Sequence, residues 1–341
     1  MGRAPYDQVT GRNKGPISKR PLYESKETIT KITGFEWIIP THQGRAAENV
    51  LFSYLVKEGD IVPGNSHFDT TKGHIEGRKA FAVDCTIDEA KDTQLEIPFK
   101  GNVDLNKLEK CLAENADKIP FVIVTVTNNT AGGQPVSMEN LRGVRAIADK
   151  YGKRVLFDSA RFVENAYFIK TREAGYADKT IKAICREMFD LADGMTMSSK
   201  KDGLVNMGGF IATRHEDWYE GAKGFCIRYE GFLTYGGMNG RDMDALAVGL
   251  DENTELETIE TRIKQVQYLA ARLDEFGIPY QRPVGGHALF VDASLILTNV
   301  PKEEFPAQTL AIELYKEAGV RGCEIGYILA DRDPITRENR F

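Results

Sequence analysis

The sequence predicts an α/β protein with a mainly parallel sheet, followed by a smaller α+β domain. Strand and helix signals alternate through residues 119–213, and a long amphipathic helix begins near residue 255. The length of 341 residues corresponds to about two domains of ordinary size. We therefore expect a flexible lead-in over 1–20, a large domain over 21–254 and a partial small domain over 255–341.

A strand–helix–strand unit in the middle of the chain carries most of this prediction. The β-branched, apolar residues 119–126 predict a strand, and a helix capped by Ser137 and stopped at Gly152 follows it. A second short strand then ends at Asp158. A unit of this kind requires parallel strands and a right-handed crossover. Asn129 and Asp158 are therefore expected just beyond the carboxyl ends of two parallel strands, where open α/β sheets bind ligands.

The same pattern extends in both directions from this unit. The further predicted elements are a strand at 37–39, helices at 46–56 and 178–191, strands at 194–198 and 208–213, and a helix at 306–318. The segment that starts at Pro283 is interpreted as the beginning of the small domain. If that domain is incomplete, we expect the apolar face of the 306–318 helix to be exposed.

Composition excludes several functional classes. Forty-four Lys and Arg against 50 Asp and Glu give a net charge of −6, without a basic face, which argues against nucleic acid as a partner. No run approaches the roughly 20 apolar residues that cross a bilayer, so no membrane partner is expected. The five cysteines form no CxxC pair and no disulfide framework. A reducing, cytoplasmic compartment fits them best, and residues 1–20 lack the apolar core of a secretory signal.

Polar side chains gather where the predicted strands pass into loops or helices. Four clusters stand at these positions: Gln43-Gly44-Arg45, Asn129, Asp158 with Arg161, and Ser198 with Lys200 and Lys201. Taken singly, each has a plain structural interpretation, such as a solvated lysine pair or a turn cap at Asp158. Their joint occurrence on successive strand ends favours a single binding site.

Other motif interpretations lack necessary parts. The Ser198-x-x-Lys201 pattern occurs in β-lactamases, but the Ser-Asp-Asn and Lys-Thr-Gly tripeptides that accompany it there are absent from the sequence. Neither GxGxxG after a strand nor GxxxxGK[ST] occurs, which excludes the usual nucleotide cradles. His67 and His74 have no acidic or thiolate partners at metal-ligand spacing.

Pyridoxal phosphate is the cofactor that uses all four clusters. It needs a lysine for its aldehyde, a carboxylate for its ring nitrogen, donors for its phenolic oxygen and an anion site for its phosphate. Lys201 is a suitable amine because the neighbouring charge of Lys200 lowers the pKa of an amine. Asp158 would pair with the ring nitrogen and Arg161 would reach the phenolic oxygen. Gly44 and Arg45 at a helix N-terminus would bind the phosphate.

These motifs resemble those of the β-eliminating lyases, tryptophanase and tyrosine phenol-lyase. The similarity runs from about residue 21 to residue 335 and includes these stretches: Pro40-Thr-His-Gln-Gly-Arg, Thr130-Ala-Gly-Gly-Gln-Pro-Val-Ser, Asp158-Ser-Ala-Arg-Phe-Val-Glu-Asn-Ala-Tyr-Phe-Ile-Lys, Ser198-Ser-Lys-Lys-Asp and Tyr235-Gly-Gly. The resemblance implies the pyridoxal-phosphate-dependent transferase-like fold of aspartate aminotransferase, fold type I.

The resemblance also implies a role for each matching residue. Lys201 would bind the cofactor and remove the substrate Cα proton, with Asp158 on the ring nitrogen and Arg161 and Asn129 at the phenolic oxygen. Phe68 would stack on the ring. The implied phosphate site comprises Gln43, Gly44, Arg45, Ser198 and Lys200. Tyr235 would reach the active site of a neighbouring subunit in a homodimer or homotetramer, and the carbonyl of Asn206 would bind an activating cation such as K⁺.

Two positions bear on the substrate that the resemblance implies. Phenol-lyases have Thr after the stacking Phe and an Arg in the C-terminal segment, whereas this chain has Asp69 and Ile325, as tryptophanase does. A carboxylate can accept the indole N–H, and an apolar residue suits a bicyclic ring. The implied reaction is α,β-elimination of L-tryptophan to indole, pyruvate and ammonia, with tyrosine phenol-lyase activity as an alternative.

Both ends of the sequence depart from the family pattern. Residues 1–20 do not resemble the family's longer N-terminal segment, and the chain ends at Phe341, before the family's Arg-Leu-x-Ile-Pro-Arg stretch, whose first Arg binds the substrate carboxylate. Two hypotheses follow: a tryptophan-cleaving lyase, or a chain that binds the cofactor but is catalytically impaired.

Overall fold

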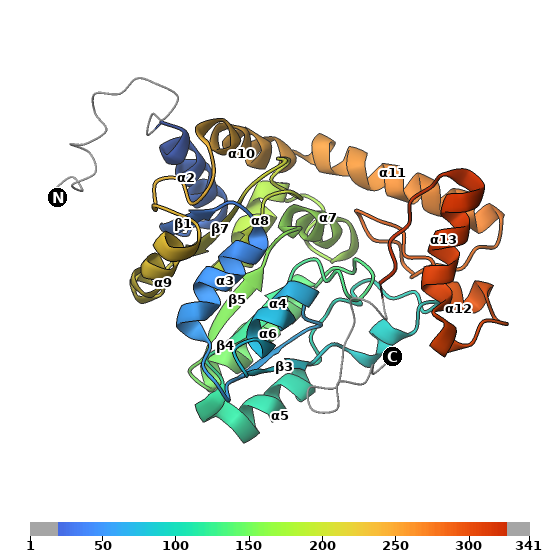
Figure 1. Cartoon of the computed structure of the whole chain (residues 1–341), viewed down its shortest axis with the longest axis horizontal. Coiled ribbons are helices and arrows are strands. Elements are labelled where there is room, and N and C mark those ends of the chain that lie inside the picture. Colours follow the sequence, from blue (N-terminus) through green and yellow to red (C-terminus); the bar gives the residue numbers. More distant parts are fainter. Residues whose placement is uncertain (1–19, 326–341) are drawn as a thin grey trace.

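The computed structural model describes residues 20–325, and its centre is a seven-stranded sheet (Figure 1). The strands are β1 (Trp37–Thr41), β2 (Ile61–Gly64), β3 (Phe81–Asp84), β4 (Phe121–Thr125), β5 (Arg154–Asp158), β6 (Gly194–Ser198) and β7 (Gly209–Thr213). Their order is β1-β7-β6-β5-β4-β2-β3, and β7 alone runs antiparallel to its neighbours. This confirms the predicted α/β class with a mainly parallel sheet. The expected lead-in lies outside the described residues, except for Arg20.

The strand directions follow from the lengths of the connections. Helices link β2 to β3, β4 to β5 and β5 to β6, which gives each pair room for a parallel crossover. Only residues 199–208 separate β6 from β7, too few for a crossover helix, and these two strands are antiparallel. The predicted strands at 119–126, 194–198 and 208–213 correspond to β4, β6 and β7.

Helices cover both faces of the sheet, and further helices follow beyond it. They are α2 (Arg20–Thr33), α3 (Gly44–Leu55), α4 (Asp69–Glu76), α5 (Leu105–Asn115), α6 (Met138–Lys150), α7 (Phe162–Arg172), α8 (Ile181–Asp190), α9 (Glu216–Tyr229), α10 (Gly240–Asn253), α11 (Leu256–Glu275), α12 (Ala293–Ile296) and α13 (Pro306–Ala318). The predicted helices at 46–56, 137–152, 178–191, 306–318 and from 255 correspond to α3, α6, α8, α13 and α11.

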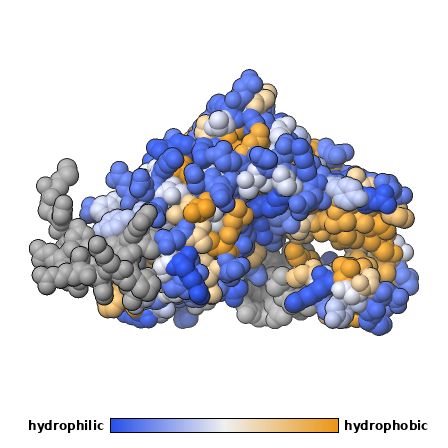
Figure 2. Space-filling model, turned by 90° about the horizontal axis from the view of Figure 1, so that it is seen from above, coloured by the Kyte–Doolittle hydropathy of each residue, from blue (hydrophilic) through white to orange (hydrophobic). Residues whose placement is uncertain are grey.

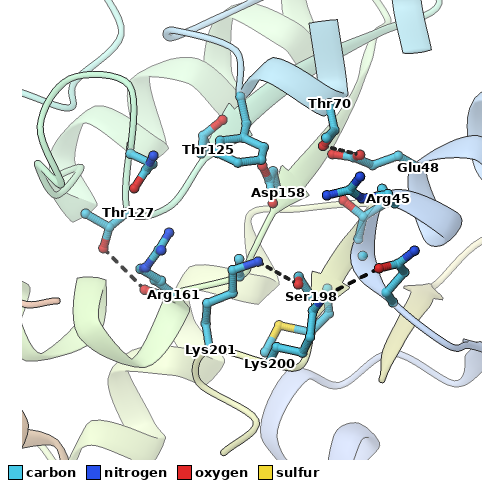
Figure 3. A pocket seen from close by; sticks show the side chains of 17 residues that line it. Arg45, Glu48, Thr70, Thr125, Thr127, Asp158, Arg161, Ser198, Lys200 and Lys201 are labelled. Atoms are coloured by element: carbon cyan, nitrogen blue, oxygen red, sulfur yellow. Dashed lines mark hydrogen bonds between the residues drawn. The ribbon is translucent and has the colours of Figure 1, made fainter. Parts of the chain in front are cut away.

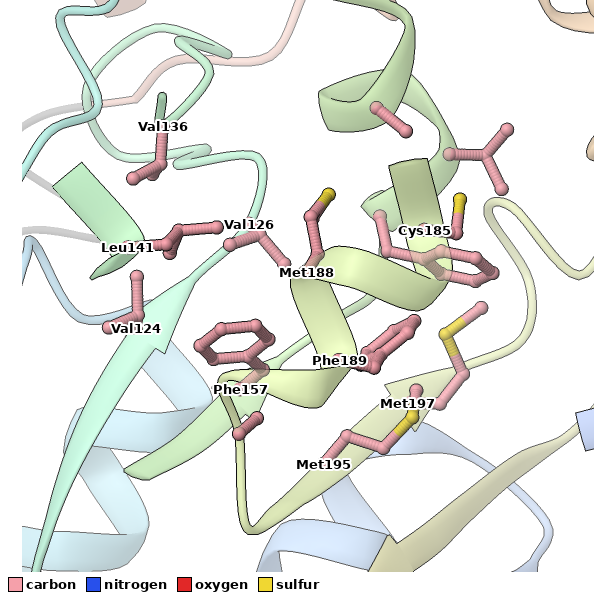
Figure 4. Packing of buried hydrophobic residues seen from close by; sticks show 14 of the residues in the cluster. Val124, Val126, Val136, Leu141, Phe157, Cys185, Met188, Phe189, Met195 and Met197 are labelled. Carbon is pink, nitrogen blue, oxygen red and sulfur yellow. The ribbon is translucent and has the colours of Figure 1, made fainter. Parts of the chain in front are cut away.

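The core has two parts because β4 and its neighbours send alternate side chains to opposite faces. Val122 and Val124 join the larger cluster with α6, α7 and α8, whereas Phe121 and Ile123 pack with α3 and α9. In the larger cluster the Phe189 ring lies 6.2 Å from the Phe157 ring, centroid to centroid (Figure 4). This packing fixes the carboxyl ends of β4, β5 and β6.

Beyond α10 the chain leaves the sheet. Helix α11 leads to a segment that contacts large-domain loops, as when Gln134 Nε2 donates to the Pro283 carbonyl at 2.7 Å. The expected small α+β domain stays a prediction, since residues 276–325 contain helical turns, α13 and an isolated bridge between Tyr280 and Val291. In the described range, no helix is long and apolar enough to cross a membrane.

The predicted exposure of α13 is confirmed. Ile312, Leu314 and Tyr315 are 47%, 41% and 61% exposed, and no residue of this helix is buried. Figure 2 shows an apolar area on the side of the molecule where Figure 1 places α13.

Candidate active site

A cavity opens at the carboxyl ends of β4, β5 and β6 (Figure 3). Its lining comes from the ends of these strands, from the loops that follow them and from the N-terminal parts of α3 and α4. The lining residues are Gln43, Gly44, Arg45, Glu48, Phe68, Thr70, Thr125, Thr127, Asn129, Asp158, Ala160, Arg161, Thr196, Met197, Ser198, Lys200 and Lys201. All four polar clusters predicted from the sequence therefore meet in one place.

Lys201 follows the end of β6 and points into this cavity. Its Nζ donates to Ser198 Oγ at 2.7 Å. Burial lowers the pKa of this amine, and the positive charge of Arg161 lowers it further. The charge of Lys200 also lowers this pKa, as expected from the sequence, but its effect is smaller than those of burial and Arg161. A lowered pKa makes the free, nucleophilic amine more available.

Asp158 ends β5 at the opposite wall of the cavity. Its Cα is in register with Thr125 on one side and Thr196 on the other, which fixes its position in the sheet. Burial raises the pKa of this carboxyl, and the charges of Lys201 and Arg161 oppose the rise. A positively charged N–H group placed in the cavity would therefore be a strong partner for Asp158.

One end of the cavity has features that suit an anion. The first turn of α3 contains no acidic residue, and the Gln43 side chain does not cap it, so backbone N–H groups and the positive end of the helix remain available. Gly44 is needed here, because a Cβ at this position would lie 2.5 Å from Ser198 Cβ. Arg45 and Lys200 add positive charge, and Lys200 Nζ donates to Gln43 Oε1 at 3.4 Å.

Asn129 lies in the loop after β4 and is held from outside the cavity. Its Oδ1 accepts from His287 Nε2 at 3.0 Å. His287 belongs to the segment after α11, far away in the sequence. The contact places this histidine beside the site.

Four predicted residues lie outside the lining of the cavity. Asp69 is the first residue of α4, next to the lining residues Phe68 and Thr70, and accepts from the Thr70 N–H at 2.8 Å. Tyr235, Asn206 and Ile325 are exposed, Ile325 by 40%. The structure thus brings the predicted cofactor residues together, except for Tyr235, and leaves the roles predicted for these four residues as expectations.

Sequence reasoning missed Glu48, whose carboxyl lies in the same cavity. It accepts from the Thr70 and Thr71 hydroxyls at 2.7 and 2.6 Å, so it joins α3 to the start of α4. Burial and the charge of Asp158 raise the pKa of Glu48 to about 8. Its spacing could have indicated this position, because Glu48 follows Gly44 by one helical turn and so lies on the same face of the helix.

The other missed lining residues are Thr70, Thr125, Thr127, Ala160, Thr196 and Met197. Thr125 is the last residue of β4, and Thr196 and Met197 are close to the end of β6. These three could have been expected from the predicted strands, because strand ends line the site. Within the described part of the chain, no group of three or more His, Cys, Asp or Glu could hold a metal ion.

The residues of this cavity fit pyridoxal phosphate. An amine with a lowered pKa faces a buried carboxylate, and an anion site with two cations lies at one end. Thr196 Oγ1, which is buried and lines the cavity, has no hydrogen-bond partner within residues 20–325. A ligand with donor and acceptor atoms would remove that penalty.

The fold is that of fold type I pyridoxal-phosphate-dependent enzymes. The structure of cystalysin from Treponema denticola, which contains a pyridoxal 5'-phosphate cofactor, matches with a TM-score of 0.65 and 17% identity. The match covers 93% of this chain and 75% of that one. At this level of identity the likeness concerns the fold alone.

The family is decided by sequence. The model of the β-eliminating lyase family matches residues 18–341, which is nearly the whole chain. The chain belongs to the β-eliminating lyase family. A probable β-eliminating lyase of Trichomonas vaginalis is 79% identical over 316 residues, which cover 93% of this chain and 69% of the relative.

Relatives named for both predicted activities have similar identities. Tyrosine phenol-lyase of Pasteurella multocida is 50% identical, over 94% of this chain and 70% of the relative. Tryptophanase of Salinibacter ruber is 48% identical, over 92% of this chain and 66% of the relative. Overall identity therefore does not separate the two substrates.

Proposed function

We propose that this chain is a pyridoxal-phosphate-dependent lyase of aromatic amino acids, which cleaves L-tryptophan to indole, pyruvate and ammonia. The supporting observation is the convergence of Lys201, Asp158 and Arg161 on one cavity that also has an anion site. Membership of the β-eliminating lyase family supports the reaction type.

When bound, pyridoxal phosphate supplies an electron sink for the bonds of the substrate Cα. Lys201 would hold the cofactor through Nζ and then accept the Cα proton at the same atom. Its lowered pKa suits both tasks, because an amine must be unprotonated to attack an aldehyde or to take a proton. Ser198 Oγ, the present partner of Nζ, would orient the amine.

Asp158 would pair with the ring nitrogen and keep it protonated. Its burial makes an isolated negative charge costly, so pairing with a cation gains more here than it would in water. Arg161 and Asn129 would donate to the phenolic oxygen, and Phe68 would pack against the ring face. Gly44 and Arg45, with Gln43, Ser198 and Lys200, would hold the phosphate.

The substrate assignment depends on Asp69 and Ile325, as proposed from the sequence. Asp69 lies beside the stacking Phe68, where its carboxylate could accept an indole N–H. Ile325 is in the C-terminal segment. It would contact the indole ring when that segment lies against the cavity. We further propose that the Asn206 carbonyl binds K⁺. The chain would form a homodimer or homotetramer in which Tyr235 reaches the site of the neighbouring subunit. A cytoplasmic location would suit the five free cysteines.

Product analysis tests this proposal. The protein loaded with pyridoxal phosphate should release indole and pyruvate in equal amounts from L-tryptophan, and Lys201→Ala should abolish the release. Lys316→Ala on α13 is the matched control, because this lysine lies on the surface, where it forms an ion pair with Glu313. Cofactor binding without any product would contradict the proposal and favour the catalytically impaired alternative.

A second arm tests the substrate. L-tyrosine should give less phenol than L-tryptophan gives indole, and Asp69→Thr should lower indole release more than phenol release. Faster release of phenol by the unaltered protein would overturn the tryptophan assignment while leaving the lyase chemistry intact.

A further inference from the structure

Helix α11 contributes the side chain of Arg262 to a buried network of charged groups. This network reaches the backbone next to Lys201 and the side chain of Asn129. Its members, here called the Arg262 network, are Arg262, Asp202, Glu164 and His287. The side chains of Asp202 and Glu164 are 0% exposed, and that of Arg262 is 27% exposed. Two carboxylates at such depth require positive partners.

The first branch of the network holds the residue after Lys201. Asp202 forms an ion pair with Arg262 Nη2 at 2.9 Å. Its other carboxylate oxygen accepts the N–H groups of Val163 and Glu164, at 2.8 and 3.1 Å, in the first turn of α7. The backbone that carries Lys201 is thereby tied to both α7 and α11.

The second branch passes through Glu164 to His287. Glu164 lies 3.4 Å from Arg262 Nη2, and its Oε1 accepts from His287 Nδ1 at 2.8 Å and from the Gly286 N–H at 3.2 Å. Burial opposes ionisation of Glu164, but His287 and Arg262 outweigh it and lower the pKa of this carboxyl overall. Glu164 therefore stays an acceptor.

His287 then has an acceptor on each side of its ring. Nδ1 faces the Glu164 carboxylate, and Nε2 faces Asn129 Oδ1 at 3.0 Å. In this arrangement both partners of the ring are acceptors, since a carboxylate and an amide oxygen only accept, and each ring nitrogen is placed to donate a hydrogen bond. With its oxygen engaged in this way, the Asn129 amide leaves its NH₂ group for the cavity.

We propose that Arg262 is a positioning residue that acts through Glu164 and His287 to fix the Asn129 amide with its NH₂ group toward the cofactor. The two carboxylates are balanced by the two cations Arg262 and His287. This inference rests on the proposed function, since the Asn129 NH₂ group matters only if it meets an acceptor such as the phenolic oxygen.

The competing arrangement is a neutral His287 with the amide reversed. In that case Nδ1–H would still bind Glu164, but Nε2 would accept from the Asn129 NH₂ group and the amide oxygen would face the cavity. An oxygen there would repel a phenolate, so the two arrangements predict opposite effects on a bound cofactor.

The first test needs no cofactor. Imidazole nitrogen NMR of the protein without pyridoxal phosphate should show His287 with protons on both nitrogens at neutral pH. Glu164→Gln should convert it to a neutral ring. A neutral His287 in the unaltered protein would overturn the proposal, whether or not the protein binds the cofactor.

The second test uses the visible absorbance of the bound cofactor. Arg262→Met and Glu164→Gln should move this absorbance toward the near ultraviolet, because a phenolic oxygen that loses its donor retains a proton. Both should weaken pyridoxal phosphate binding about 10- to 100-fold, the range expected for loss of a hydrogen bond to a charged group. Arg262→Lys, which keeps the charge, should restore most of the visible band.

Arg272→Met is the matched control, since this arginine is on the same helix and pairs with Glu275 at the surface. If Arg262→Met does not fold, Glu164→Gln carries the test, because its amide has nearly the same shape as the carboxyl. An unchanged spectrum in folded Glu164→Gln would refute the proposal. Absence of cofactor binding by the unaltered protein would refute the proposed function, and the NMR result would still decide the state of His287.

Discussion

Helices α7 and α13 have similar lengths but opposite environments. In α7, eight consecutive residues, 162–169, are buried, whereas α13 has none. Helix α7 packs beside α8 in the larger core cluster, and its N-terminus is held by Asp202, next to Lys201. The comparison shows that the cofactor end of the site is built on a closely packed core. The C-terminal segment expected to meet the substrate has little packing within the described residues.

The largest difference between the two helices should appear on truncation of an aromatic side chain. Phe168 of α7 is 1% exposed, and Phe168→Ala should lower the free energy of unfolding by about 3–5 kcal/mol, since it leaves a cavity in the core. Tyr315 of α13 is 61% exposed, and Tyr315→Ala should change it by less than about 0.5 kcal/mol. Urea denaturation gives the free energy of unfolding of both variants. Equal losses would mean that something covers α13 in solution.

A smaller difference should appear in the pH dependence of stability. The pKa of Glu164 in α7 is lowered below its usual value of 4.5, so folding favours its ionised form. The stabilisation is complete above pH 4.5 and is lost as the pH falls through the lowered value. Glu164→Gln should therefore cost about 1.5–3 kcal/mol at pH 7, and this cost should shrink in acid.

Glu313 of α13 provides the control for this measurement, since it forms an exposed ion pair with Lys316. Glu313→Gln should change stability by less than about 1 kcal/mol at pH 7. A pH profile of Glu164→Gln that runs parallel to that of the unaltered protein would contradict the ionised state of Glu164.

The sequence predicted those parts of the fold that rest on local patterns. Strand β4 is a continuous apolar run, and α6 has a cap at Ser137 that accepts from the Asn140 N–H, so both could be recognised. Strands β2 and β3 have only four residues each, and β2 contains Pro63 and Gly64, so they gave little signal. The antiparallel direction of β7 depends on the length of its connection rather than on its composition.

The candidate site was predictable for a related reason. Lys201, Asp158 and Asn129 follow strand ends, and parallel strands bring such positions to one edge of the sheet. Glu48 was missed because it lies inside a helix, and His287 because its contact with Asn129 joins segments 158 residues apart. Contacts between distant segments leave no local pattern in a single sequence.

In the proposed site Lys201, and no other amine, holds the cofactor opposite Asp158. Reduction of the protein loaded with pyridoxal phosphate by borohydride, followed by peptide mapping, identifies the lysine that carries the cofactor. We expect the reduced cofactor on Lys201 alone, and the same treatment of Lys201→Ala should leave the chain unlabelled. Label on Lys200, or an even distribution over surface lysines, would contradict the account.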